Sequence, residues 1–150
     1  INASGEETGT YSFNILDLSN SIPVDLDTNY TGTLEPGQET HFYNFTGNEG
    51  QRLYLDTSGG AGTSSTNWTL YDSNNRVIGG NRLNNDIEVL LTKTDNYTLA
   101  IRGNNGNEAV NYSFEVITPD TNTEALTLDT TITSTIAEKG ERDVYTFLIH

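Results

Sequence analysis

Apolar and polar side chains alternate without interruption along the segment Val110-Asn111-Tyr112-Ser113-Phe114-Glu115-Val116. Successive side chains of an extended strand point to opposite faces, so this segment has one apolar face and one polar face. Such a strand is stable when its apolar face packs against another layer of structure. The segment therefore predicts a β-strand that contributes every second side chain to a core.

The same period of two recurs through most of the chain, whereas the helical period is nearly absent. Turn clusters rich in Gly, Asn and Pro separate the alternating runs. Short strands at this spacing are typical of antiparallel sandwiches and barrels, and we expect an all-β antiparallel sandwich. The alternating runs are centred on Phe13, Asn44, Tyr54, Thr69, Val89, Leu99 and Phe114.

The segment 110–116 also has a counterpart near the start of the chain, because Gly9-Thr10-Tyr11-Ser12-Phe13-Asn14-Ile15 matches it at an offset of 101. After one inserted residue the offset becomes 102, and the match then continues through several further positions. Register held over several elements indicates a tandem repeat with a period near 100 residues. The matched pairs at the second offset include Leu26 with Leu128, Leu34 with Ile136, Glu39 with Glu141, Tyr43 with Tyr145 and Phe45 with Phe147.

This period divides the chain into one complete module and two partial ones. Residues 24–117 form the complete module, residues 1–17 are the closing strand of a preceding repeat, and residues 126–150 are the opening strands of a following repeat. The polar segments 17–23 and 118–124 are the linkers. The opening strands at 126–150 have apolar faces with no partner copy in the chain. We expect them to pack with the strand at 11–17 or to form a strand-exchanged dimer with another molecule.

Composition narrows the class of protein. The 150 residues carry 7 Lys and Arg against 21 Asp and Glu, a formal net charge of −14. Nucleic acids and anionic membranes attract basic surfaces, so neither is expected as a partner. The chain contains neither Cys nor Met and starts at Ile1, and we expect it to be a segment of a longer protein. Its acidic, Asn-rich composition suits an exported bacterial protein, extracellular or at the cell surface, and no run is long enough for membrane insertion.

The middle module has four motifs in a fixed order. They are an opening that runs from Gly32 through Gly37 to Tyr43 and Phe45, a turn at Gly50-Gln51, a hairpin at Leu70-Tyr71-Asp72, and an ending at Tyr112-Ser113-Phe114. In this order the motifs resemble those of the bacterial pre-peptidase C-terminal domain. The position before the Tyr-x-Phe pair, Asp in the family, is His41 here and Asp143 in the following copy. The resemblance implies a jelly-roll-like sandwich that serves as a non-catalytic accessory module. Some members bind calcium, collagen or polysaccharide, and others act as spacers.

The residues themselves give no reason to expect an enzyme. The two imidazoles are His41 and His150, and His41 shares the parity of Tyr43 and Phe45, which points it inward at the mouth of the core. The chain has no Gly-x-Ser-x-Gly nucleophile elbow and no phosphate-binding loop. We therefore expect a spacer or accessory module of a large exported protein, one that assists adhesion or an attached hydrolase and contacts neighbouring repeats.

The alternative function is binding, either of calcium or of a polymer. Calcium is the candidate cofactor because hard oxygen ligands gather around one hairpin and its return, at Asp72, Asn74, Asn81, Asn85 and Asp86. The same residue types are also ordinary turn formers. A polysaccharide or collagen-like polymer would use outward-facing rings, which parity assigns to Phe42, Tyr54 and Tyr71. Trp68 has core parity and is expected to be a core anchor rather than a sugar-stacking residue.

Overall fold

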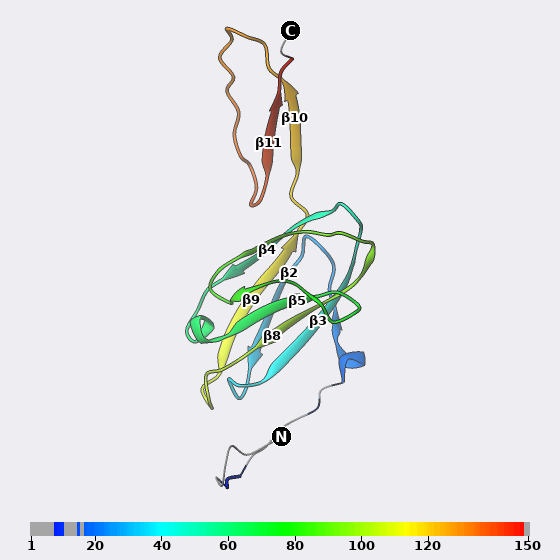
Figure 1. The fold of residues 1–150 in the computed structure, drawn as a ribbon. Helices are drawn as coiled ribbons and strands as arrows, with labels where there is room; N and C mark the ends of the chain where they lie inside the picture. Colours follow the sequence, from blue (N-terminus) through cyan, green and yellow to red (C-terminus); the bar gives the residue numbers. More distant parts are fainter. Residues whose placement is uncertain (1–7, 11–14, 16, 149–150) are drawn as a thin grey trace.

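The computed structural model describes residues 8–10, 15 and 17–148 of the chain. The predicted strand at 11–17 falls largely outside these residues. The described residues form eleven β-strands and two short 3-10 helices, η1 (Leu18–Asn20) and η2 (Thr63–Ser65), and contain no α-helix (Figure 1). The all-β fold expected from the alternation is confirmed.

Two sheets pack face to face and make the sandwich. One sheet has the order β1-β3-β8-β5-β6 and the other has the order β2-β9-β4-β7. Every pairing among β2 to β9 is antiparallel. Strands consecutive in the chain mostly lie in different sheets, which is the connectivity of an eight-stranded jelly roll. The strands of the sandwich are β1 (Ile22–Pro23), β2 (Asn29–Leu34), β3 (Thr40–Gly47), β4 (Arg52–Ser58), β5 (Asn67–Tyr71), β6 (Val77–Arg82), β7 (Ile87–Leu90), β8 (Asp95–Arg102) and β9 (Val110–Ile117).

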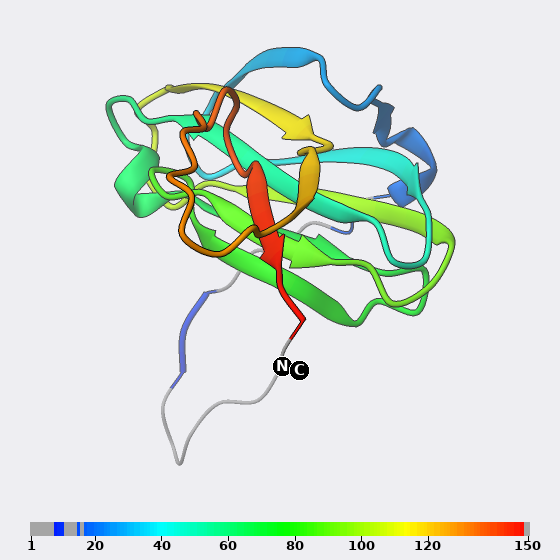
Figure 2. The ribbon, with the colours of Figure 1, turned by 90° about the horizontal axis from the view of Figure 1, so that it is seen from above.

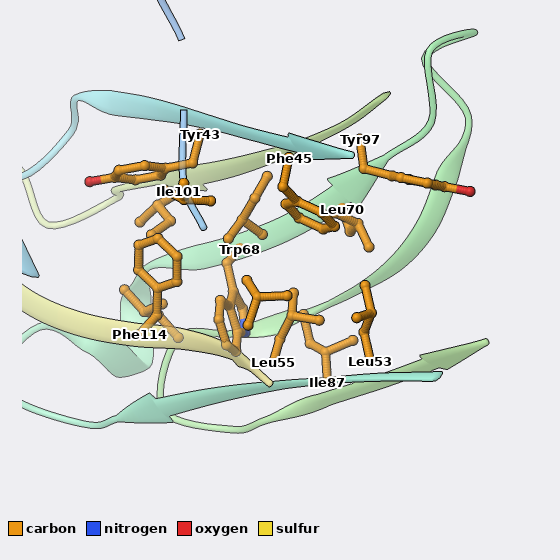
Figure 3. Packing of buried hydrophobic residues seen from close by; sticks show 14 of the residues in the cluster. Tyr43, Phe45, Leu53, Leu55, Trp68, Leu70, Ile87, Tyr97, Ile101 and Phe114 are labelled. Atoms are coloured by element: carbon orange, nitrogen blue, oxygen red, sulfur yellow. The ribbon is translucent and has the colours of Figure 1, made fainter. Parts of the chain in front are cut away.

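The core lies between the two sheets and follows the alternation in the sequence. In β9 the side chains of Val110, Tyr112, Phe114 and Val116 are buried. Figure 3 shows side chains from both sheets pointing toward one another, with Trp68 between them. Trp68 is fully buried, so it is the core anchor that its parity predicted. The interior is therefore filled by large apolar side chains, as in other sandwiches.

The remaining strands, β10 (Thr121–Ala125) and β11 (Arg142–Thr146), form a separate two-stranded parallel sheet. They extend from one end of the sandwich, beyond the end of β9 (Figure 1), and lie nearest the viewer when the molecule is seen from above (Figure 2). Only the three residues 118–120 separate β9 from β10. The segment 118–124, expected to be a linker, thus contains most of a strand.

The β10–β11 pair repeats a feature of the middle module at the offset of 102. Ile22 in β1 pairs in parallel with Tyr43 in β3, and Glu124 in β10 pairs in parallel with Tyr145 in β11. Beyond each pair one further backbone bond follows, from Val24 N to the Asn44 carbonyl and from Leu126 N to the Thr146 carbonyl.

The connections before these strands repeat as well. Asp27 and Asp129, 102 residues apart, both have a left-handed backbone, with φ of 58° and 60°. The amide of Glu39 donates to the Pro36 carbonyl, and the amide of Glu141 donates to the Glu138 carbonyl. One element does not repeat, because residues 131–136, the counterparts of β2, form no strand. In the middle module β2 pairs with β9, the closing strand of the same copy.

Candidate functional site

The five residues proposed as calcium ligands fall into two groups at opposite ends of the β5–β6 hairpin. Asp72 and Asn74 lie at the turn that follows β5. Asn81 is opposite Trp68, near the start of β5. Asn85 and Asp86 follow β6 at that same end. Residues at the two ends of a strand of this length are about 13 Å apart, too far to share one ion.

The Asp72 carboxylate already has a full set of partners. Its Oδ1 accepts hydrogen bonds from the amides of Asn74 and Arg76, each at 2.9 Å. Its Oδ2 lies 3.2 Å from Lys93 Nζ, which also reaches Asp95 at 2.8 Å. The hydrogen bond from the Arg76 amide and the contact with Lys93 keep the pKa of Asp72 below its ordinary value. This arrangement fixes the hairpin turn to the β7–β8 loop.

The second group is also engaged in local bonds. Asp86 accepts from the Tyr54 hydroxyl at 2.7 Å and from the Thr57 amide at 3.0 Å. Asn81 Nδ2 donates to the Asp86 carbonyl, and the Asn85 carbonyl accepts from Trp68 Nε1. Within the described residues, no three His, Asp or Glu side chains come together as a metal site would need.

The three aromatic residues assigned to a ligand platform lie on two different faces. Phe42 and Tyr71 are on the outer face of the sheet that contains β3, β8 and β5. Tyr54 lies on β4, in the other sheet. Its bond to Asp86 raises the pKa of Tyr54 to about 12 and holds the ring against its own sheet. The platform expected on neighbouring strands therefore reduces to Phe42 and Tyr71.

Phe42 and Tyr71 border a shallow groove with a volume of about 1350 Å³. Ala100 and Thr98 of β8 lie between them, opposite Phe42 and Tyr71 respectively in the strand register. Strands two places apart in a sheet are about 10 Å apart, so these small side chains form a floor between two rings. Leu18 of η1 also lines this groove. This is the strongest candidate for a ligand surface on the sandwich.

A chain of polar side chains runs from the end of this groove into the core. Glu39 Oε2 lies 3.4 Å from His41 Nε2, and His41 Nδ1 lies 2.6 Å from the Tyr112 hydroxyl. The Tyr112 hydroxyl is in turn 2.6 Å from the Tyr43 hydroxyl, which is buried. The inward orientation of His41 predicted by parity is confirmed. Burial raises the pKa of Tyr112, so its hydroxyl stays protonated and serves as a hydrogen-bond partner rather than a base.

Sequence reasoning missed the ion pairs that link distant parts of the chain. Arg52 and Arg142 both donate to Glu88, at 2.7 and 2.8 Å, and Lys139 donates to Asp56 at 2.6 Å. Two of these three pairs join residues of β11 or its preceding turn to the sandwich. The scarcity of basic residues in so acidic a chain is the one signal that could have drawn attention to them. No helix among the described residues has the length and apolar character needed to cross a bilayer.

Comparison with known proteins identifies the fold. The pre-peptidase C-terminal domain of a collagenase from Bacillus anthracis superimposes with a TM-score of 0.55 at 20% identity, over 65% of this chain and 94% of that domain. PliG of Aeromonas hydrophila, a periplasmic inhibitor of g-type lysozyme, superimposes with a TM-score of 0.52 at 17% identity, over 63% of this chain and 91% of PliG. No protein-family model matches the sequence, and a sequence search of curated proteins finds no match. The antiparallel sandwich is thus a fold shared with both proteins.

Proposed function

We propose that this chain is part of a non-catalytic repeat array in an exported bacterial protein, where it spaces or assists an adhesive or hydrolytic partner domain. The complete module spans residues 24–117, residues 1–17 belong to a preceding copy, and residues 126–150 open the next copy. Export is supported by the acidic, Cys-free composition. The fold is compatible with this role, because a sandwich presents two broad faces and needs no catalytic group.

The observation that supports this proposal is the match in backbone geometry at the offset of 102. It is accompanied by a contrast in burial at the equivalent apolar positions. Leu34 is fully buried and Phe45 is 4% exposed, whereas their counterparts Ile136 and Phe147 are 60% and 58% exposed. Side chains that are core residues in one copy are thus in solvent in the other. Burial of such side chains is the main source of stability in a sandwich, so residues 126–148 have the pattern of a module without its second half.

A chain extended to complete the second copy tests the proposal. Residues 49–117 would be appended after His150, because residues 126–150 correspond to 24–48. We expect amide hydrogen exchange in β11 to slow by about 100-fold or more, since strands inside a folded core open rarely. Exchange would be followed residue by residue by NMR, with β3 of the middle module as the internal reference.

A second extended chain, in which residues 24–48 also replace 126–150, serves as the matched control because it is a direct duplication. Protection of both second copies supports the proposal. Protection of the control alone would show that residues 126–150 cannot open a module. If the duplicated control is protected but exchange in β11 of the extended chain stays as fast as in the parent chain, the repeat interpretation is overturned.

The groove between Phe42 and Tyr71 supports a second candidate function, the binding of a polysaccharide or collagen-like polymer. Rings set on either side of a floor of small side chains can contact an extended chain laid along the sheet. Phe42→Ala and Tyr71→Ala are each expected to weaken binding about tenfold or more, as measured by calorimetry or on glycan and collagen-peptide arrays. Tyr54→Ala, on the other sheet, is the control that should leave binding unchanged. Equal loss in all three variants, or no binding by the parent chain, would rule out the groove.

Calcium remains a prediction for the two groups of oxygen ligands described above. A cation near Asp72 would compete with Lys93, which lies 3.2 Å from the carboxylate. The polymer candidate is preferred over calcium because the rings it needs share one groove, whereas the oxygen ligands are divided between two ends of a hairpin.

A further inference from the structure

The outer face of β4 and β7 carries an acidic surface that is already in contact with the C-terminal segment. Alternation places Arg52, Tyr54 and Asp56 on this face, opposite the buried Leu53 and Leu55. In the strand register Glu88 of β7 lies beside Tyr54, and Glu115 of β9 lies beside Asp56. We call this surface, formed by Arg52, Tyr54, Asp56, Glu88 and Glu115, the junction face.

The turn that leads into β11, residues 138–141, and Arg142 at the start of β11 contact the junction face. Lys139 Nζ donates to Asp56 Oδ1 at 2.6 Å, and Arg142 donates to Glu88 Oε1 at 2.8 Å. Arg52 donates in the opposite direction, to the Gly140 carbonyl at 2.9 Å and to Thr121 of β10 at 3.1 Å. Donors from both the sandwich and the C-terminal segment therefore take part in the contact, which reaches β10 as well as the turn before β11.

Gly140 lets the turn approach the sheet closely. A Cβ atom at this position would lie 2.8 Å from Tyr54 Cβ, well inside van der Waals contact. Its φ of 76° is also a conformation that residues with a side chain rarely adopt. Both the shape and the charge of the turn therefore fit the junction face.

The charges at this contact are complementary. Three of the seven basic residues, Arg52, Lys139 and Arg142, meet here. The bond to Asp56, with Asp86 and Glu115 close by, raises the pKa of Lys139 above its ordinary value. The bond from Arg52 and the proximity of Arg142 lower the pKa of Glu88. Both directions mean that each ionised form is stabilised by its surroundings.

The basic residues of this segment have no basic counterparts in the opening turn of the middle module. At the offset of 102, Lys139 corresponds to Gly37, Gly140 to Gln38, and Arg142 to Thr40. The opening turn of the middle module therefore has no positive charge at either position. The two opening turns share one backbone hydrogen bond, from Glu39 to Pro36 and from Glu141 to Glu138, but they differ in the side chains they present and in the left-handed backbone found at Gly140.

We propose that the junction face is a docking surface for the opening turn of the following module, and that this ionic joint sets the orientation of the two modules. The inference rests on the repeat array proposed above and names the partner surface within it. Ion pairs on a protein surface are individually weak and are screened by salt. The joint therefore holds one orientation at low ionic strength and loosens at high ionic strength.

Spin-label distance measurements on the full chain test the joint. The chain has no Cys, so Asn96→Cys in β8 and Thr131→Cys in the C-terminal segment introduce the two labelling sites. We expect a narrow distance distribution at about 0.01 M salt that broadens at about 1 M, where the screening length falls from about 30 Å to about 3 Å. At low salt, K139A/R142A is expected to lose the narrow peak. The matched control R76A/R102A removes the same charge elsewhere and should keep it.

Reversing the charges of one ion pair distinguishes loss of the ionic joint from a general effect of the changed net charge. Lys139→Glu alone should lose the narrow peak, and adding Asp56→Lys should restore it. NMR shifts of residues 123–125, which do not pair with a substituted residue, must stay close to those of the parent chain in each variant, which shows that the β10–β11 pair remains formed. A narrow peak that survives K139A/R142A, or a broad distribution in the parent chain at low salt, overturns the joint. Neither result bears on the repeat itself, which is judged by protection of β11 in the extended chain.

Discussion

Replacement of Trp68 with alanine is expected to lower the free energy of unfolding by about 3–5 kcal/mol, the range for a large aromatic side chain deleted from a core. Trp68 is fully buried on β5, between the two sheets (Figure 3). Its Nε1 donates to the Asn85 carbonyl at 3.0 Å, so the variant loses a hydrogen bond as well as packing. The cavity would lie at the centre of the sandwich, where the surrounding strands have little freedom to close it.

Urea unfolding followed by circular dichroism measures this effect, because removal of the single Trp also removes the fluorescence signal. Trp68→Phe is the matched variant, since it keeps an aromatic ring but cannot donate to Asn85. Its loss should be clearly smaller than that of Trp68→Ala. A loss below about 1 kcal/mol for the alanine variant, the range of ordinary surface substitutions, would contradict the central position of this side chain.

Tyr112→Phe is expected to lower the free energy of unfolding by about 1–3 kcal/mol, although it removes a single oxygen atom. The Tyr112 hydroxyl lies 2.6 Å from both the Tyr43 hydroxyl and His41 Nδ1. Without it, the buried Tyr43 hydroxyl has no partner within the part of the chain that the structure describes, and an unpaired polar group in a core is costly. The exposed side of His41 can still bind water, so the loss comes mainly from Tyr43.

A double-mutant cycle checks this explanation. Tyr43→Phe in the Tyr112→Phe background removes the unpaired hydroxyl, so the double variant should be at least as stable as Tyr112→Phe alone. Chemical denaturation at neutral pH gives all four values, because burial keeps the pKa of both Tyr residues above the ordinary value. Strictly additive losses from the two substitutions would show that the hydroxyls do not depend on one another.

The sandwich core could be predicted because alternation assigns each side chain to a face without reference to partners. Trp68 and His41 were placed correctly on this basis. The parallel pairs β1–β3 and β10–β11 could not be predicted, because they depend on backbone hydrogen bonds and not on the side-chain pattern. Residues 121–125, Thr-Asn-Thr-Glu-Ala, have no apolar periodicity and therefore resemble a linker in sequence.

The candidate sites show the limit of the same reasoning. Parity placed Phe42, Tyr54 and Tyr71 on the outside, but parity cannot say which of two sheets a strand joins. β4 pairs with β9 and β7, and this pairing moves Tyr54 away from the other two rings. The Asp72–Lys93 contact was missed for a related reason, because it links side chains from two separate loops that only the fold brings together.

The three residues between β9 and β10 bear on how a ligand would be held by neighbouring modules. An extended segment of three residues spans about 10 Å, far less than the length of a module. A ligand bound at one module is therefore presented close to the equivalent surface of the next module. Such tethering raises the effective concentration of the second site to the millimolar range typical of short linkers. At the offset of 102 Phe42 corresponds to Val144, so a ligand shared by the two copies would meet a ring in one and an aliphatic side chain in the next.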